Sequence, residues 1–181
     1  MSHTRRKVFI SYHHADKDEV NEFIKTFSND RDVFITRALG AGMDQNIIDS
    51  KDTSYVMRRI RELYLKDSTV TLVMFGKCTW ARKYVDWEIQ ASLRNSDNIT
   101  PNGLLGVKLP SYDEDEGYYP NRLNKNLLQD GDDDCYARVI NYPTRKDYLI
   151  NWIEDAFNAR SSRKSLINNP RDRFGYNRTC P

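Results

Sequence analysis

The chain has 181 residues, enough for one domain with its own hydrophobic core. Hydrophobic residues make up 39% of it, charged residues make up 30%, and the formal net charge is +2, a balance typical of soluble globular proteins and not of nucleic-acid-binding chains. No apolar run approaches the ~18 residues of a membrane-spanning helix, and the first residues, MSHTRRK, lead into a strand-like run without the apolar region of a signal peptide. We therefore expect a cytoplasmic protein.

The basic residues are concentrated near the C-terminus. Residues 158–181 hold six basic side chains and one acid, Asp172, whereas the rest of the chain is mildly acidic, with 22 basic and 25 acidic residues. We therefore divide the chain into a main domain, residues 1–157, and a basic C-terminal tail, residues 158–181, which we expect to form an arm on the surface. A short basic segment is weak evidence for a nucleic-acid partner.

The cysteines and histidines do not form a metal-binding pattern. Cys78, Cys135 and Cys180 are far apart without a CxxC spacing, and their odd number favours reduced thiols over a disulfide framework. His13 and His14 are adjacent, so both could not face one metal ion from a regular strand. We therefore expect reduced cysteines and no metal site.

Strand and helix patterns alternate along the first part of the chain. Residues 7–12, KVFISY, are rich in β-forming residues and predict a short buried strand. Asp16 and Glu19 have the spacing of a capping box, and apolar residues then recur at helical spacing (Val20, Phe23, Ile24 and Phe27). The elements that follow are a strand at 33–35, a loop at 36–52 that holds Gly40 and Gly42, and a helix at 53–66.

The second part begins with the most apolar segment of the chain. Residues 69–76, TVTLVMFG, are almost continuously apolar or β-branched, which predicts a central parallel strand covered on both faces. The elements that follow are a helix at 79–96, strands at 103–109 and 136–142, and a helix that opens at Pro143, Thr144 and Asp147 with a core face of Leu149, Trp152, Ile153 and Ala156. Residues 110–134 form an acidic loop insertion that we expect to be irregular and exposed, because its acids could not be buried cheaply.

This alternation predicts the fold class. Strands that alternate with helices form parallel sheets with right-handed crossovers. We therefore expect a three-layer, flavodoxin-like α/β fold, with a parallel sheet of about five strands and helices on both faces. Ligands of such sheets bind outside the carboxyl ends of the strands, an edge that would be formed here by residues 11–16, 36–52 and 76–80.

A carboxylate in the predicted helix 79–96 is the best candidate for chemistry. Trp80, Tyr84 and Glu88 recur every four residues and form a stripe that borders the buried face. Partial burial against aromatic side chains would raise the pKa of Glu88 and suit it to acid–base or ion-stabilising work. The alternative is an ordinary surface acid near Lys83, and the spacing alone leaves both interpretations open.

Other residues near the predicted ligand edge lack a catalytic motif. Ser11 has no GxSxG sequence around it, and the chain contains neither GxGxxG nor a Walker A sequence. His13 either lines a cleft or lies in a solvated loop, and the sequence leaves this open too.

Two segments together resemble TIR-like domains. Residues 7–18, KVFISYHHADKD, are similar to the opening of those domains, which is an apolar strand, Ser-Tyr or Ser-Phe, a polar turn and Asp. Residues 68–89, STVTLVMFGKCTWARKYVDWEI, are similar to their third strand and following helix, with Gly-x-x-Thr, aromatic residues, Arg and Glu in order. The subgroup with this pattern is the ThsB family of bacterial Thoeris anti-phage defence, and the resemblance covers about residues 6–109.

The resemblance implies an activity and a set of site residues. Family members cleave the nicotinamide–ribose bond of NAD and release a signalling nucleotide, often a cyclic or otherwise modified ADP-ribose. Their catalytic glutamate corresponds to Glu88, and the aromatic residue before it, frequently Trp in the family, corresponds to Tyr84. Phe9, Ser11 and His13 correspond to positions that line the nicotinamide and ribose pocket. NAD is then a substrate, and no bound cofactor is implied.

The expected partners follow from that activity. They are NAD, an effector protein that responds to the nucleotide product, and an activator derived from phage; self-assembly is left open, and neither membrane nor nucleic acid is expected. One alternative is a TIR-like interaction module without catalysis that signals by assembly. Another is a different flavodoxin-like class, such as a nucleoside-processing transferase. We further expect a pocket with Glu88 at its floor and Phe9, Ser11 and Tyr84 among its walls.

Overall fold

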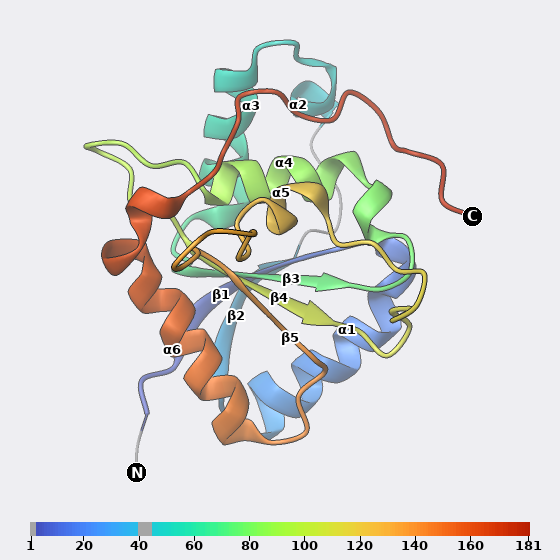
Figure 1. Ribbon diagram of the computed structural model, residues 1–181, viewed down its shortest axis with the longest axis vertical. Coiled ribbons are helices and arrows are strands. Elements are labelled where there is room, and N and C mark those ends of the chain that lie inside the picture. The colour runs from blue at the N-terminus through green and yellow to red at the C-terminus, as the bar shows by residue number, and fades with distance from the viewer. Residues whose placement is uncertain (1–2, 40–44) are drawn as a thin grey trace.

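A computed structural model describes residues 3–39 and 45–181 of the chain (Figure 1). Its centre is a five-stranded parallel sheet with the strand order β2-β1-β3-β4-β5. The strands are β1 (Arg6–Tyr12), β2 (Phe34–Leu39), β3 (Val70–Phe75), β4 (Gly103–Lys108) and β5 (Arg138–Ile140). The predicted flavodoxin-like sheet is confirmed, and the most apolar segment of the sequence forms its middle strand, in which every residue is buried.

Helices cover both faces of the sheet (Figure 1). One face carries α1 (Lys17–Phe23) and α6 (Lys146–Ser162), and the other carries α3 (Thr53–Ile60), α4 (Lys83–Ser92) and α5 (Asn121–Asn124). Alternate side chains of β1 serve the two faces, because Val8 and Ile10 belong to the core that includes α1 and α6, whereas Phe9 packs with α3 and α4. The shorter helical segments are η1 (His14–Asp16), η2 (Ile24–Asp30), α2 (Gln45–Asp49), η3 (Arg61–Leu65), η4 (Thr79–Ala81) and η5 (Lys164–Leu166).

The helix predicted at 79–96 is shorter than its pattern indicated. Its first turn is a separate 3₁₀ turn, η4, and Arg82 after it has extended backbone angles of φ −96° and ψ 121°. The α-helix therefore begins only at Lys83, and it ends at Ser92. Because Arg82 interrupts the helical repeat, Trp80 does not continue the stripe of Tyr84 and Glu88, so that part of the prediction is wrong.

The loop predicted at 36–52 is also partly wrong. The strand β2 continues through Thr36 and Arg37 to Leu39, and residues 45–49 form the short helix α2. Ile47 of α2 is fully buried, which explains why this polar segment is ordered as a helix against the core. Gly40 and Gly42 lie outside the described residues.

The acidic insertion, residues 110–134, is irregular except for α5. Asp113 is partly exposed and the other acidic side chains of the insertion are exposed, as their charge predicted. The middle of the insertion differs, because Pro120, Arg122, Leu123 and Asn126 are buried. Leu123 packs in the core cluster that α4 forms with β3 and β4, so the insertion closes the core on this side of the sheet.

The C-terminal residues do not form a free arm. The helix α6 continues through residue 157 to Ser162, and the chain after η5 passes over α4 (Figure 1). Three side chains of α4 hold it there: Asp86 Oδ2 accepts from Phe174 N at 3.0 Å, Trp87 Nε1 donates to Phe174 O at 2.7 Å, and Gln90 Nε2 donates to Arg171 O at 2.8 Å. We call residues 167–181 the C-terminal strap. The composition had suggested a surface arm; residues 167–181 are all exposed or partly exposed, and their contacts fasten them along α4.

The strap ends at a disulfide bond. Cys180 is bonded to Cys78 in the turn after β3, with a Cα–Cα distance of 5.6 Å, although 102 positions separate the two residues in the sequence. Cys135 is a buried free thiol. The prediction of reduced thiols is therefore wrong for Cys78 and Cys180, because the return of the strap to β3 leaves no trace in the cysteine spacing. Every helix in the described ranges is too short or too polar to span a membrane.

Gly103, the first residue of β4, lies directly against the backbone of α6. A methyl group added there would overlap the carbonyl group of Ala156 and come within 3.0 Å of Phe157 N. Because a packed helix backbone cannot move aside as a side-chain end can, Gly103→Ala is expected to lower the free energy of unfolding by about 1–3 kcal/mol. Urea denaturation measures this change. Gly175→Ala is the matched control, since an added Cβ there has nothing within 4 Å; an equal loss in both variants would contradict the explanation.

Candidate active site

The carboxyl group of Glu88 lies in the interior, against the end of β1. Ser11 Oγ donates a hydrogen bond to Glu88 Oε2 at 2.5 Å. Ser11 is fully buried, and Glu88 is only 4% exposed. The two meet because Ser11 shares a face of β1 with Phe9, and α4 packs across β1 and β3 on that face.

Burial changes the acidity of this group. Removal from water disfavours the charged carboxylate and raises the pKa of Glu88 to about 8, while the hydrogen bond from Ser11 opposes that rise. Within the described residues, no basic side chain forms an ion pair with Glu88 or offsets its burial. The raised pKa agrees in direction with the interpretation of the helical stripe, and Glu88 is not an ordinary surface acid.

Asp86, two residues before Glu88 on α4, is a buried carboxyl group of the opposite kind, because a cation compensates its charge. It is also buried, at 5% exposure, but Arg122 Nε and Nη2 donate to its two carboxylate oxygens at 2.9 and 3.3 Å. Phe174 N of the strap adds a third hydrogen bond. Asp86 is thus a structural carboxylate whose charge is compensated, whereas Glu88 is buried with one neutral hydroxyl partner.

The other predicted site residues lie around Glu88 at different depths. Phe9 is fully buried in a cluster with Trp87, and Tyr84 packs at the edge of that cluster, with its ring centroid 5.7 Å from that of Trp87. His13 is partly exposed, and its pKa is lowered because burial disfavours the charged imidazole and Arg82 adds positive charge nearby. These side chains share one side of the sheet, but Phe9 and Ser11 are closed off from solvent. Their substrate-binding roles, and that of Tyr84, stay predictions.

A second polar group joins the loop after β1 to the turn after β3. Thr79 Oγ1 donates to Asp16 Oδ2 at 2.8 Å and accepts from Gly76 N at 3.0 Å. Asp16 therefore does not cap α1 with its side chain, as the capping-box spacing had predicted. A Cβ at Gly76 would lie 2.7 Å from Asp16 Oδ1, which explains a glycine at this position. The only sequence signal for this contact between Asp16, Gly76 and Thr79 was the Gly-x-x-Thr pattern of residues 76–79.

Comparison with known families identifies the family of this chain. The model of the family described as Thoeris protein ThsB, TIR-like domain, matches residues 9–114. The chain belongs to this family. The matched region contains Ser11, Thr79 and Glu88, and it ends before the C-terminal strap. A comparison with curated proteins finds no match.

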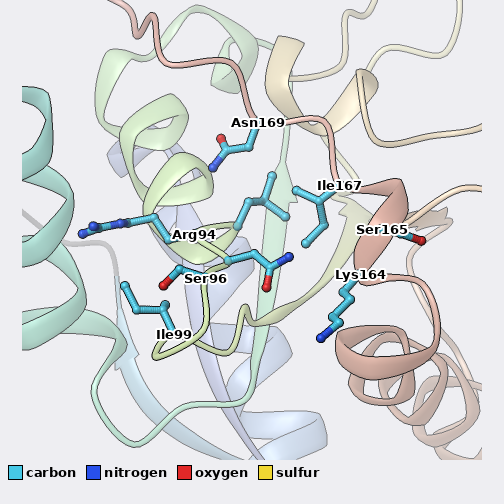
Figure 2. A pocket seen from close by; sticks show the side chains of 9 residues that line it. Arg94, Ser96, Ile99, Lys164, Ser165, Ile167 and Asn169 are labelled. Atoms are coloured by element: carbon cyan, nitrogen blue, oxygen red, sulfur yellow. The ribbon is translucent and has the colours of Figure 1, made fainter.

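A separate pocket of this TIR-like domain has neither Ser11 nor Glu88 among its lining residues. Figure 2 shows it between the segment after α4, with Arg94, Ser96 and Ile99, and the segment around η5, which supplies Lys164, Ser165, Ile167 and Asn169. The first segment leads into the amino end of β4. Ligands of parallel sheets bind at the carboxyl edge, so this pocket is not the candidate active site.

The raised pKa of Glu88 predicts a pH-dependent stability of the TIR-like domain. The pKa of Glu88 is about 8 in the folded state and about 4.5 in the unfolded state, so the folded protein binds the Glu88 proton more tightly. The stability gained from this proton is fully present below pH 4.5 and is lost as the pH rises through about 8. The shift corresponds to on the order of 4–5 kcal/mol, at about 1.4 kcal/mol per pKa unit. Glu88→Gln, which stays neutral, should therefore exceed the wild type in stability near pH 9 but not near pH 4. Urea denaturation at both pH values measures this, and parallel pH profiles for the two proteins would refute it.

Proposed function

We propose that this TIR-like domain cleaves the bond between nicotinamide and ribose in NAD and produces an ADP-ribose-derived signalling nucleotide, cyclic or linear, that activates a separate effector protein. The observation that carries the proposal is the buried carboxyl group of Glu88, which has Ser11 as its hydrogen-bond partner and no compensating cation among the described residues. A carboxyl group held in this way costs stability without serving the fold, as the contrast with Asp86 illustrates. Perturbed groups of this kind are typical of functional sites.

The reaction suits a single carboxylate. Breaking the glycosidic bond leaves an oxocarbenium-like ribose, and a nearby anion stabilises that positive charge. Nicotinamide departs as a neutral base and takes the bonding electron pair, so the leaving group needs no strong acid. Attack on the ribose carbon by a ring nitrogen of the same molecule would give a cyclic product, and attack by water would give ADP-ribose.

The substrate itself supplies the charge that Glu88 lacks. The nicotinamide ring of NAD is positively charged, and an opposite charge nearby favours the ionised carboxylate. Binding of NAD would thus lower the pKa of Glu88 from about 8 and generate the anion where the reaction needs it. Ser11 would hold the carboxylate in place through its hydroxyl group.

The remaining residues have positioning roles in this proposal. Tyr84 and Phe9 offer aromatic surface for the nicotinamide ring, and His13 lies at the more exposed end of the group. Glu88 is 4% exposed, so the side chains over it must move apart before a substrate can reach it. This closed state is also the observation that favours the second candidate function, a TIR-like module that signals by assembly without catalysis.

The test is whether the protein consumes NAD and releases nicotinamide. Purified protein is mixed with NAD, with and without an extract of phage-infected cells, and nicotinamide and nucleotide products are measured by mass spectrometry. Release of nicotinamide with a product of ADP-ribose mass or of cyclic ADP-ribose mass supports the enzyme. Unchanged NAD under all of these conditions, together with assembly of the protein, would support the interaction module instead.

A further inference from the structure

A second pocket, with aromatic walls, lies at the carboxyl edge of the sheet. It has a volume of about 510 Å³ and is lined by Trp80, Tyr112, Gly117, Tyr118, Tyr119, Asn121, Asn124 and Arg178. Trp80 follows β3, and residues 112–119 follow β4, so the pocket is at the edge where parallel sheets bind ligands. We call it the aromatic pocket.

One of its aromatic side chains, Tyr118, is presented to solvent, and the other three are partly buried. Tyr118 is 63% exposed, yet its ring contacts that of Trp80, with the centroids 5.1 Å apart and the planes tilted by 55°. Tyr112 and Tyr119 are anchored below them by edge contacts with the buried ring of Phe75. The pocket therefore has a fixed aromatic base and an exposed aromatic mouth. Such surfaces bind nucleobases, because every base has a π-face that stacks on an aromatic ring.

The polar groups of the pocket are available to a ligand. Among the described residues, no carboxylate forms an ion pair with Arg178, whose guanidinium lies 4.1 Å from the centroid of the Phe174 ring. Its backbone is fixed, since Arg178 N donates to Ala81 O at 2.8 Å, and the Cys78–Cys180 disulfide holds the chain two residues later. In the same described part of the chain, the side-chain amides of Asn121 and Asn124 have no protein partner. An anchored cation beside two amides is suited to a phosphate group and the polar edge of a base.

The aromatic pocket is distinct from the Ser11–Glu88 site. In the sheet order, β1 and β4 lie on opposite sides of β3; Glu88 contacts β1, whereas the aromatic pocket adjoins the segment after β4. The charge around the pocket limits what enters it, because the acidic residues 113–116 lie between Tyr112 and Gly117 of its wall. These acids repel a polyanion, while the single unpaired Arg178 suits one phosphate group.

We propose that the aromatic pocket binds a purine nucleoside monophosphate, with the base stacked on Trp80 and Tyr118 and the phosphate paired with Arg178. This site is independent of the proposed NAD cleavage. The C-terminal strap has a role in it, because the strap brings the only cation among the lining residues, Arg178, to the pocket.

Isothermal titration with AMP, GMP, adenosine and inorganic phosphate tests the proposal. We expect AMP or GMP to bind, and adenosine and phosphate to bind more weakly. Tyr118→Ala should weaken AMP binding by roughly tenfold through lost stacking. Arg178→Gln should weaken AMP binding but leave the weak binding of adenosine unchanged. Tyr148→Ala is the matched control, since Tyr148 is an exposed tyrosine of α6 on the other face of the sheet. Thermal melts confirm that each variant is folded.

The same titrations contain the results that would overturn the proposal. No binding of either nucleotide at millimolar concentration would do so, as would equal affinity of wild type and Tyr118→Ala. Loss of AMP binding in Glu88→Gln would place the nucleotide at the other site. Tighter binding of a single-stranded oligonucleotide than of AMP would assign the pocket to nucleic acid and refute a mononucleotide ligand.

Discussion

Glu88→Gln is expected to abolish nicotinamide release from NAD while the protein stays folded. Glutamine keeps the shape of the side chain and a carbonyl oxygen that can accept the hydrogen bond from Ser11, but it cannot become an anion. The electrostatic stabilisation of the oxocarbenium-like ribose is therefore lost, which typically costs ~10²-fold or more in rate. The measurement is the rate of nicotinamide release by wild type and variant under activating conditions, with thermal melts to establish folding.

A matched substitution separates this effect from a general loss of negative charge. Glu62 lies on the surface at η3, where its carboxylate is half-exposed and pairs with Arg59. Glu62→Gln makes the same chemical change at a surface carboxylate that does not contact Ser11, and it should retain wild-type turnover. If folded Glu88→Gln also kept wild-type turnover, Glu88 would not be the catalytic residue. A wild type that is silent with every activator would favour the interaction module.

The parts of the fold that sequence predicted well are those with local patterns. Residues 69–76 are apolar on both faces, which is possible only for a strand covered on both sides, and β3 is that strand. The core face of α6 was predicted by its spacing in the same way: Leu149, Ile153 and Ala156 are buried, and Trp152 packs against the same core but is only partly buried. For Glu88, the helical stripe predicted burial, and the family resemblance singled it out among the acids of the chain.

The parts that sequence could not predict depend on contacts between distant residues. Asp16 has a capping-box spacing, but its carboxylate bonds to Thr79, which is 63 positions away. The extended backbone of Arg82 interrupts an otherwise regular helical repeat and turns Trp80 toward Tyr118 instead of Tyr84. The strap and its disulfide are similar cases, because basic composition describes a segment's charge and not the surface on which it packs.

Arg122→Gln is expected to lower the stability of the fold strongly. Arg122 lies in the acidic insertion, most of which is exposed, but its own side chain is buried. Its guanidinium is 4% exposed and pairs with Asp86 beneath the strap. Removing one partner of a buried ion pair leaves the other charge uncompensated, which costs about 3–5 kcal/mol. Urea denaturation measures the loss. Lys125→Gln, an exposed residue of the same segment, should change stability by no more than about 0.5 kcal/mol.

The same substitution should also release the C-terminal strap. Arg122 donates to Asn169 Oδ1 at 2.9 Å, to Pro170 O at 2.7 Å and to Asp172 O at 2.6 Å, so it joins the strap to α4 through Asp86. Without these bonds, the backbone of the strap should detach from α4 and enter a protease active site more readily, so trypsin should cut after Arg171 and Arg173 faster in Arg122→Gln than in Lys125→Gln. Because the disulfide still ties Cys180 to Cys78, the fragment that contains Cys180 should separate only after reduction. A strap that resists trypsin equally in both variants would show that Arg122 is not its anchor, and that the contacts of Trp87 and Gln90 hold it without the ion pair.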